Sequence, residues 1–140
     1  MTRALLDVNV LLALAWPNHQ FHGAAQAWFR RDGRRAWATC ALTQLSFVRL
    51  SSNPAFTPMP ATPRGAASLL EQMTAHPAHE FWESLAPASA GLFARAMGHQ
   101  QVMDAYLARL AERRRGRLVT FDREAAVHAA APGAVLVIEP

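Results

Sequence analysis

Short apolar runs alternate along the chain with longer stretches in which apolar residues recur at helical spacing. In the first run, 5–8, residues on both faces of the pleat are apolar, which is typical of a strand in a parallel sheet that is covered on both sides. These runs predict strands at 5–8, 36–39, 80–85, 118–121 and 134–138.

The stretches between these strands have the periodicity of amphipathic helices. Phe21, Ala25, Trp28 and Phe29, for example, recur at i, i+4, i+7 and i+8 and share one helical face. Helices are expected over 10–15, 21–31, 41–51, from 63 onward, from 103 to about 113, and over 123–131. In the helices that begin at 63 and at 103, the buried positions expected from the spacing include Leu69, Leu70, Met73, Met103, Leu107 and Leu110.

The order of these elements indicates the fold class. Strands that are separated by helices form βαβ units with right-handed crossovers, which build a parallel sheet with helices on both faces. The sequence therefore predicts an α/β fold, a three-layer α/β/α sandwich with a short parallel sheet. A length of 140 residues suits one such domain, spanning 1–140.

The charged residues narrow the choice of partner and of chemistry. All 14 basic residues are arginine, and the formal net charge is +4, a balance that suits a polyanion or an acidic protein. Arginine clusters at helix C-termini also offset the helix dipole, so each cluster has a purely structural explanation as well. Without lysine, no lysine-dependent mechanism is available. This excludes a phosphoacceptor receiver domain, which shares the sandwich but needs a lysine beside the phosphate.

Two absences bear on the cellular compartment. The single cysteine, Cys40, permits neither an intramolecular disulfide nor a cysteine-rich zinc site. The N-terminal segment carries an acid where a signal peptide would be apolar, and no apolar run reaches about 18 residues. We therefore expect a cytoplasmic protein that does not interact with a membrane.

Three aspartates lie beside predicted core. Asp7 follows the apolar run 4–6, Asp122 follows the run 118–121, and Asp104 lies in the first turn of an apolar helix. The carboxyl ends of parallel strands meet at one edge of a sheet, so these side chains can converge. A carboxylate beside a core costs several kcal/mol unless it is compensated, and a divalent cation is a common compensation. The alternative is that Asp104 and Asp122 are simple helix N-caps.

Four segments together resemble a known family. They are 5–14 (LLDVNVLLAL), 42–54 (LTQLSFVRLSSNP), 98–107 (GHQQVMDAYL) and 118–123 (LVTFDR). In this order and spacing they resemble the PIN-domain nucleases, specifically the VapC-type toxins of bacterial toxin–antitoxin pairs. The resemblance implies a ribonuclease site with Mg²⁺ or Mn²⁺, an RNA substrate and a VapB-type antitoxin that occludes the site. A homodimer is also expected.

The resemblance assigns roles to individual residues. Asp7, Asp104 and Asp122 would be the acidic metal-site residues, Thr120 a hydroxyl that lines their pocket, and Asn9 a residue that steadies Asp7. His99, five residues before Asp104, is a further candidate for the border of this pocket.

One position departs from the family pattern. Gln44 stands where relatives usually have glutamate, in a Thr-Glu-x-x-Phe-x-Arg context that this chain otherwise retains. Glutamine keeps an oxygen that can accept from a metal-bound water, but it has no charge and cannot act as a general base. Gln44 would then orient groups from the outer shell of the site. The alternative function is a PIN-fold module that binds RNA or antitoxin with weakened or lost nuclease activity.

Aromatic residues are numerous near the N-terminal helices. Trp16, Phe21, Trp28, Phe29 and the loop 56–59 supply more aromatic and methionine surface than a small core needs. They indicate either core packing or an interface, such as a groove for the amphipathic helix of an antitoxin or a homodimer face.

Overall fold

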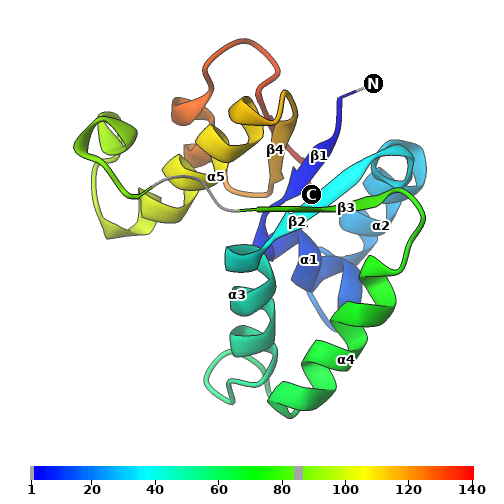
Figure 1. Cartoon of the computed structure of the whole chain (residues 1–140). Coiled ribbons are helices and arrows are strands. Elements are labelled where there is room, and N and C mark those ends of the chain that lie inside the picture. The colour runs from blue at the N-terminus through cyan, green and yellow to red at the C-terminus, as the bar shows by residue number, and fades with distance from the viewer. Residues whose placement is uncertain (1, 84–86) are drawn as a thin grey trace.

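The computed structural model describes residues 2–83 and 87–140, and its strands form one parallel sheet (Figure 1). The strand order is β3-β2-β1-β4-β5, so β1 occupies the centre. The strands are β1 (Ala4–Leu6), β2 (Trp37–Cys40), β3 (His79–Trp82), β4 (Arg117–Thr120) and β5 (Val135–Val137). All the strand pairs are parallel, which confirms the predicted α/β class.

Helices cover both faces of the sheet. The α-helices are α1 (Val8–Ala15), α2 (His22–Arg31), α3 (Ala41–Ser51), α4 (Pro63–Thr74) and α5 (Val102–Arg113). Figure 1 shows α5 on one side of the sheet and α1, α2 and α4 on the other. Shorter 3₁₀ turns complete the chain: η1 (Gly33–Arg35), η2 (Ala90–Phe93), η3 (His99–Gln101) and η4 (Arg123–His128).

Each face of the sheet has its own apolar cluster. One cluster joins alternate strand residues such as Leu6 and Val119 to apolar residues of α1 to α4. The other joins Leu5 and Leu118 to α5 and η4. Neighbouring residues of β1 and β4 thus point to opposite faces, as the two-residue repeat of a strand requires. The sheet is therefore a buried middle layer, and its strand ends are the places where polar groups can gather.

Several predicted boundaries were wrong by one or more residues. The first strand ends at Leu6, because the next residue, Asp7, is the N-cap of α1. The Asp7 side chain accepts a hydrogen bond from the amide of Val8, which begins the helix. The second strand begins at Trp37 and the third at His79. Residues 84 and 85 of the predicted third strand lie outside the described residues. The predicted helix 123–131 is the shorter 3₁₀ helix η4.

The buried face of α5 was only partly predicted. Leu107 and Leu110 are buried, but Met103 is 36% exposed and Asp104 is buried in its place. Alanines at 105, 108 and 111 also lie on the buried side. Small residues form much of the buried face of α5. A prediction from the larger apolar residues alone therefore placed Met103 on the buried face, where the structure has Asp104.

The aromatic residues divide between core and surface. Trp28 is 2% exposed and belongs to the apolar core, and the ring of Trp16 stacks on Phe47 with centroids 6.5 Å apart. Phe56 and Met59, in the proline-rich loop, are exposed. In the part of the chain that the structure describes, no helix has the length and apolar character needed to cross a membrane.

Candidate functional site

The acids that the sequence placed at strand ends lie at the carboxyl ends of the two central strands. Asp7 directly follows β1 and Asp122 follows β4 by one residue, and these strands are neighbours in the sheet. The pairing extends past β1, because the amide of Asp7 donates to the carbonyl of Val119 at 2.9 Å. Strand pairing thus brings Asp7 and Asp122 to the same edge of the sheet, although more than 100 residues separate them along the chain.

Asp7 is held by hydrogen bonds to both of its carboxyl oxygens. Its Oδ1 accepts from the Val8 amide at 2.7 Å, and its Oδ2 accepts from the Thr120 hydroxyl at 2.7 Å. The side chain is buried, and this burial raises the pKa of Asp7, while the two hydrogen bonds act to lower it. The negative charge of Asp122 raises the pKa further. The geometry thus fixes the direction in which the Asp7 carboxylate points.

Thr120 is the centre of the network around Asp7. Besides donating to Asp7, its hydroxyl accepts from Asn9 Nδ2 at 3.2 Å and from the Asp122 amide at 3.0 Å. Asn9 in turn accepts from the amide of Phe121 at 3.3 Å. Asn9 therefore steadies Asp7 indirectly, through the hydroxyl of Thr120, and not by a direct contact.

Asp104 enters the same region from α5. It is 6% exposed, and within the described residues its Oδ2 is buried and has no hydrogen-bond partner. The pKa of Asp104 is raised to about 7, first by burial and then by the negative charges of Asp7 and Asp122. A hydrogen bond to Asp122 and the charge of Glu124 raise the pKa in the same direction. These carboxyl groups therefore repel one another when all of them are ionised.

The N-cap explanation holds for one of the two acids concerned. Asp122 Oδ1 accepts from the amide of Glu124 at 2.9 Å, so Asp122 does cap η4. Asp104 lies within α5, and the residue that precedes this helix is Gln101. Capping therefore explains the position of Asp122 in part and leaves the burial of Asp104 unexplained.

Gln44 belongs to a different hydrogen-bond network. Its Nε2 donates to the Thr39 hydroxyl at 2.9 Å, and this hydroxyl lies 2.8 Å from Nε2 of His79. Thr39 follows Trp37 by two residues and so shares its face of the sheet, whereas Thr120 shares the face of Leu118. The structure brings Asp7, Asn9, Asp104, Thr120 and Asp122 together, whereas the amide nitrogen of Gln44 binds Thr39 of β2. His99, in η3, is exposed.

The donor set suits a hard divalent cation. In the described ranges, no three His, Cys, Asp or Glu side chains are spaced as a ready-made metal site. Mg²⁺, however, needs only one or two carboxylates, because it keeps several waters. The unpartnered Asp104 Oδ2 beside other carboxylates is a buried oxygen that such an ion would satisfy. The residues that are present therefore fit Mg²⁺ or Mn²⁺.

Glu124 was not identified from the sequence. Its amide binds Asp122, and its charge contributes to the raised pKa of Asp104. The available signal was its spacing of two residues from Asp122, which suits a carboxylate that accepts from the amide two residues later.

Comparison with known proteins gives the family. Residues 4–131 match the model of the PIN domain. The chain is 45% identical over 131 residues to Ribonuclease VapC39 of Mycobacterium tuberculosis, covering 91% of this chain and 94% of the relative. It is 44% identical over 135 residues to Ribonuclease VapC44 of the same organism, covering 94% of each. Ribonuclease VapC38, also from that organism, is 43% identical over 122 residues, which cover 85% of this chain and 84% of that protein. The chain therefore belongs to the PIN-domain family, within which it groups with the VapC ribonucleases.

Proposed function

We propose that this VapC-family protein is an endoribonuclease toxin that cleaves RNA phosphodiester bonds in the presence of Mg²⁺ or Mn²⁺. The observation that carries the proposal is the buried, unpartnered Asp104 Oδ2 within a group of carboxylates at the strand ends. The family supports the same activity, since relatives along nearly the whole chain are named ribonucleases. Because its substrate would be RNA, we expect it to act in the cytoplasm.

Some residues of the site would bind the cation, and others would hold those ligands in position. Asp7, Asp104 and Asp122 would hold the cation, which when bound would stabilise charge on the phosphoryl oxygens and lower the pKa of an attacking water. Thr120 would keep the Asp7 carboxylate in place through its hydrogen bond, and Asn9 would keep Thr120 in place. In the metal-free protein, Asp104 would carry a proton near neutral pH because its pKa is raised to about 7.

The second candidate function is a module that binds RNA or antitoxin and cleaves weakly or not at all. The observation that favours it is Gln44, which has no charge and donates its amide to Thr39. A site that lacks this carboxylate has less negative charge with which to bind a cation. Retained RNA affinity without cleavage would distinguish this module from an active nuclease.

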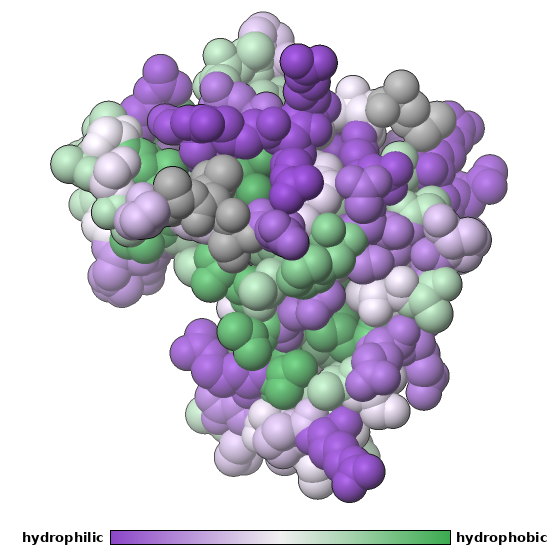
Figure 2. Space-filling model, viewed as in Figure 1, coloured by the Kyte–Doolittle hydropathy of each residue, from purple (hydrophilic) through white to green (hydrophobic). Residues whose placement is uncertain are grey.

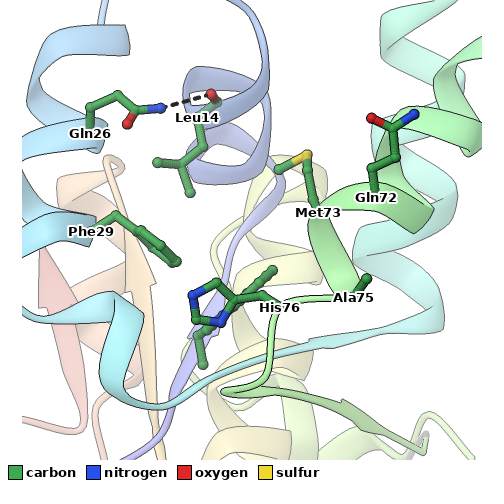
Figure 3. A pocket seen from close by; sticks show the side chains of 8 residues that line it. Leu14, Gln26, Phe29, Gln72, Met73, Ala75 and His76 are labelled. Carbon is green, nitrogen blue, oxygen red and sulfur yellow. Dashed lines mark hydrogen bonds between the residues drawn. The ribbon is translucent and has the colours of Figure 1, made fainter.

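A VapB-type antitoxin is the partner that the family implies. An apolar cavity of about 480 Å³ lies between α1, α2 and α4, and its lining includes Phe29, Trp37, Met73 and His76. Figure 3 shows Gln26 and Gln72 in this lining, with the Gln26 amide bonded to the Leu14 carbonyl. An apolar side chain from an amphipathic antitoxin helix would fit such a cavity.

We also propose a homodimer, as we expected from the sequence. Hydrophobic surface gathers over the region of α3, α4 and β3 in Figure 2. Leu45 on α3 is 67% exposed and Phe81 on β3 is 49% exposed, and both line a shallow apolar pocket there. Exposed apolar surface of this kind is typical of protein–protein contact sites.

The first test is cleavage of a structured RNA pool by the purified chain in Mn²⁺ or Mg²⁺. We expect cutting that disappears in EDTA and in the Asp7→Asn variant. If a folded and metal-loaded sample cuts nothing, the nuclease proposal fails and the binding module replaces it. If Asp7→Asn cuts as fast as the wild type, the assigned site is wrong. A separate variant, Gln44→Glu, introduces the residue that the family usually has at this position. It should bind Mn²⁺ more tightly than the wild type, as measured by calorimetry.

A further inference from the structure

A polar pocket gathers basic side chains from three separate segments, two of which are α5, which carries Asp104, and η4, which Asp122 caps. Its volume is about 340 Å³, and its lining includes Arg95, Arg109, Glu112 and His128. Arg95 follows η2, Arg109 and Glu112 lie on α5, and His128 ends η4. The elements η2 and η4 both pack against α5, so their contacts with this helix bring the side chains together.

The positive charge of this pocket is only weakly neutralised. Arg109 Nε lies 3.7 Å from Glu112 Oε2, and both side chains are partly exposed, so this ion pair contributes little. Arg95 donates to the carbonyls of Val127 and Ala129 at 3.3 and 3.4 Å, which holds its guanidinium at the end of η4 without removing its charge.

His128 adds a polar atom that lacks a partner. Within the described residues its Nε2 is buried and makes no hydrogen bond. Burial lowers the pKa of His128, and the positive charge of Arg95 lowers it further, which shows that the two side chains are close. A buried polar group without a partner destabilises the fold, and an oxygen-rich ligand in this pocket would reduce that cost.

The pocket and the acids share the same structural elements. Ala105, which directly follows Asp104 on α5, lines the pocket. Arg109 lies about 7.5 Å from Asp104 along the helix axis and about 140° around it. Asp122 begins η4 as its N-cap, and His128 ends it. A nucleic acid strand with one phosphate at the acids would therefore pass close to this pocket with a neighbouring phosphate.

We propose that Arg109, Arg95 and His128 form a phosphate-binding subsite that holds an RNA phosphate adjacent to the scissile one. This inference rests on the proposed ribonuclease function. The carboxylates of the site repel RNA, so affinity has to come from cations beside them. The planar guanidinium group of arginine matches the oxygens of a phosphate.

The test measures binding of a fluorescent single-stranded RNA in EDTA, where metal-dependent cleavage is suppressed. Arg109→Ala should weaken binding several-fold, and the slope of log Kd against log salt should fall by about 0.7, the value for one phosphate contact on a single strand. Arg64→Ala is the matched control, because Arg64 is an exposed residue of α4 and its loss changes the net charge equally. Equal effects of the two variants would overturn the proposal.

A second arm locates the phosphate. RNAs with one neutral methylphosphonate linkage at successive positions are tested against the wild type and Arg109→Ala. At one linkage beside the cleavage site, we expect the neutral linkage and the variant not to be additive, because each removes the same contact. Additive effects at every linkage would overturn the subsite. Arg109→Gln keeps much of the side-chain length, so it replaces Arg109→Ala if the latter has a lowered melting temperature.

The remaining outcomes separate this inference from the proposed function. Cleavage that depends on Asp7, together with unchanged RNA binding in Arg109→Ala, would overturn the subsite and leave the nuclease intact. RNA binding that depends on Arg109 without any cleavage would support the subsite and remove the nuclease. A glutamate-rich peptide that needs Arg109 for binding when RNA does not would show that the pocket takes carboxylates, and would overturn the proposal.

Discussion

The buried carboxyl group of Asp104 costs the fold stability in the absence of a cation. It lies among alanines and leucines on the inner face of α5, close to two other acids. A group with these surroundings contributes nothing to packing that an uncharged residue of the same shape would not contribute better. Its presence is easier to explain by a function at this position than by stability.

Asp104→Asn should stabilise the metal-free protein at neutral pH. Because the pKa of Asp104 is about 7 in the folded protein and near 3.8 in the unfolded chain, the folded state binds its proton more tightly. The wild type is then most stable below pH 4 as far as this group is concerned, and it loses stability as the pH rises toward 7. Asparagine removes this loss, so the variant should unfold at a higher temperature at pH 7.

The measurement is thermal unfolding of both proteins in EDTA between pH 4 and 7.5. The difference between the two melting temperatures should grow with pH, and Mg²⁺ should raise the melting temperature of the wild type more than that of the variant. A difference that stays constant with pH would contradict the assignment of this pKa.

Thr120 should be needed both for stability and for activity. Thr120→Val keeps the shape but removes the donor to Asp7 and the acceptor for Asn9 and for the Asp122 amide. We expect a loss of about 1–3 kcal/mol in the free energy of unfolding and a drop of about 10–100-fold in cleavage. Urea denaturation and the RNA assay check these values. Thr120→Ser keeps the hydroxyl and is the control, and wild-type behaviour of the valine variant would show that the network is dispensable.

At the scale of the elements, the turn between α5 and β4 is tightly constrained. A Cβ atom on Gly116 would lie 2.6 Å from the carbonyl oxygen of Arg3 and 2.6 Å from the ring of Trp82. The first of these atoms belongs to the backbone of the chain leading into β1, and Trp82 is fully buried. Neither neighbour can give way easily, so this turn accepts only glycine without a shift of the sheet.

Gly116→Ala should therefore destabilise the protein, by about 1–3 kcal/mol as for other overpacked sites. Gly23→Ala, in α2, is the opposite case, because a Cβ there meets nothing within 4 Å. It should stabilise the protein by about 0.5–1 kcal/mol through helix propensity. Chemical denaturation of the two variants tests both signs, and a neutral Gly116→Ala would mean that the turn can relax.

The kinds and the order of the elements could be predicted because the sequence pattern is local. Residues 4–6 and the middle of the strand 117–120, Leu118 and Val119, are apolar on both faces, and Pro63 after Thr62 marks the start of α4. Met103 and η4 were predicted incorrectly for a physical reason. The inner face of α5 is formed largely by alanines, whose spacing cannot be distinguished from a solvent-exposed face in an alanine-rich chain. The six residues of η4 are too few for two turns of an α-helix, so the spacing of apolar residues cannot distinguish an α-helix from a 3₁₀ helix here.

At the scale of the whole molecule, the candidate site exists only because distant segments meet. Because the carboxyl ends of parallel strands meet at one edge of a sheet, the convergence of Asp7 and Asp122 could be predicted. The position of Asp104 in the first turn of α5 allowed the same prediction for its side chain. The direction of the Gln44 amide was not predictable, since it depends on the partners Thr39 and His79 from two other strands. The same holds for the pocket of Arg95, Arg109 and His128, whose members come from three segments.

The hydroxyl of Thr120 also determines where a proton can reside in the metal-free site. A threonine hydroxyl has one hydrogen to give and two lone pairs. Two incoming N–H groups, from Asn9 and from the backbone of Asp122, occupy the lone pairs, so the single hydrogen goes to Asp7. Both oxygens of Asp7 then accept a hydrogen bond, and these two bonds counteract part of the rise in pKa that burial causes. The Oδ2 of Asp104 has no hydrogen-bond partner within the described residues, and the pKa of Asp104 is raised to about 7. An arriving cation would therefore displace the proton that Asp104 carries.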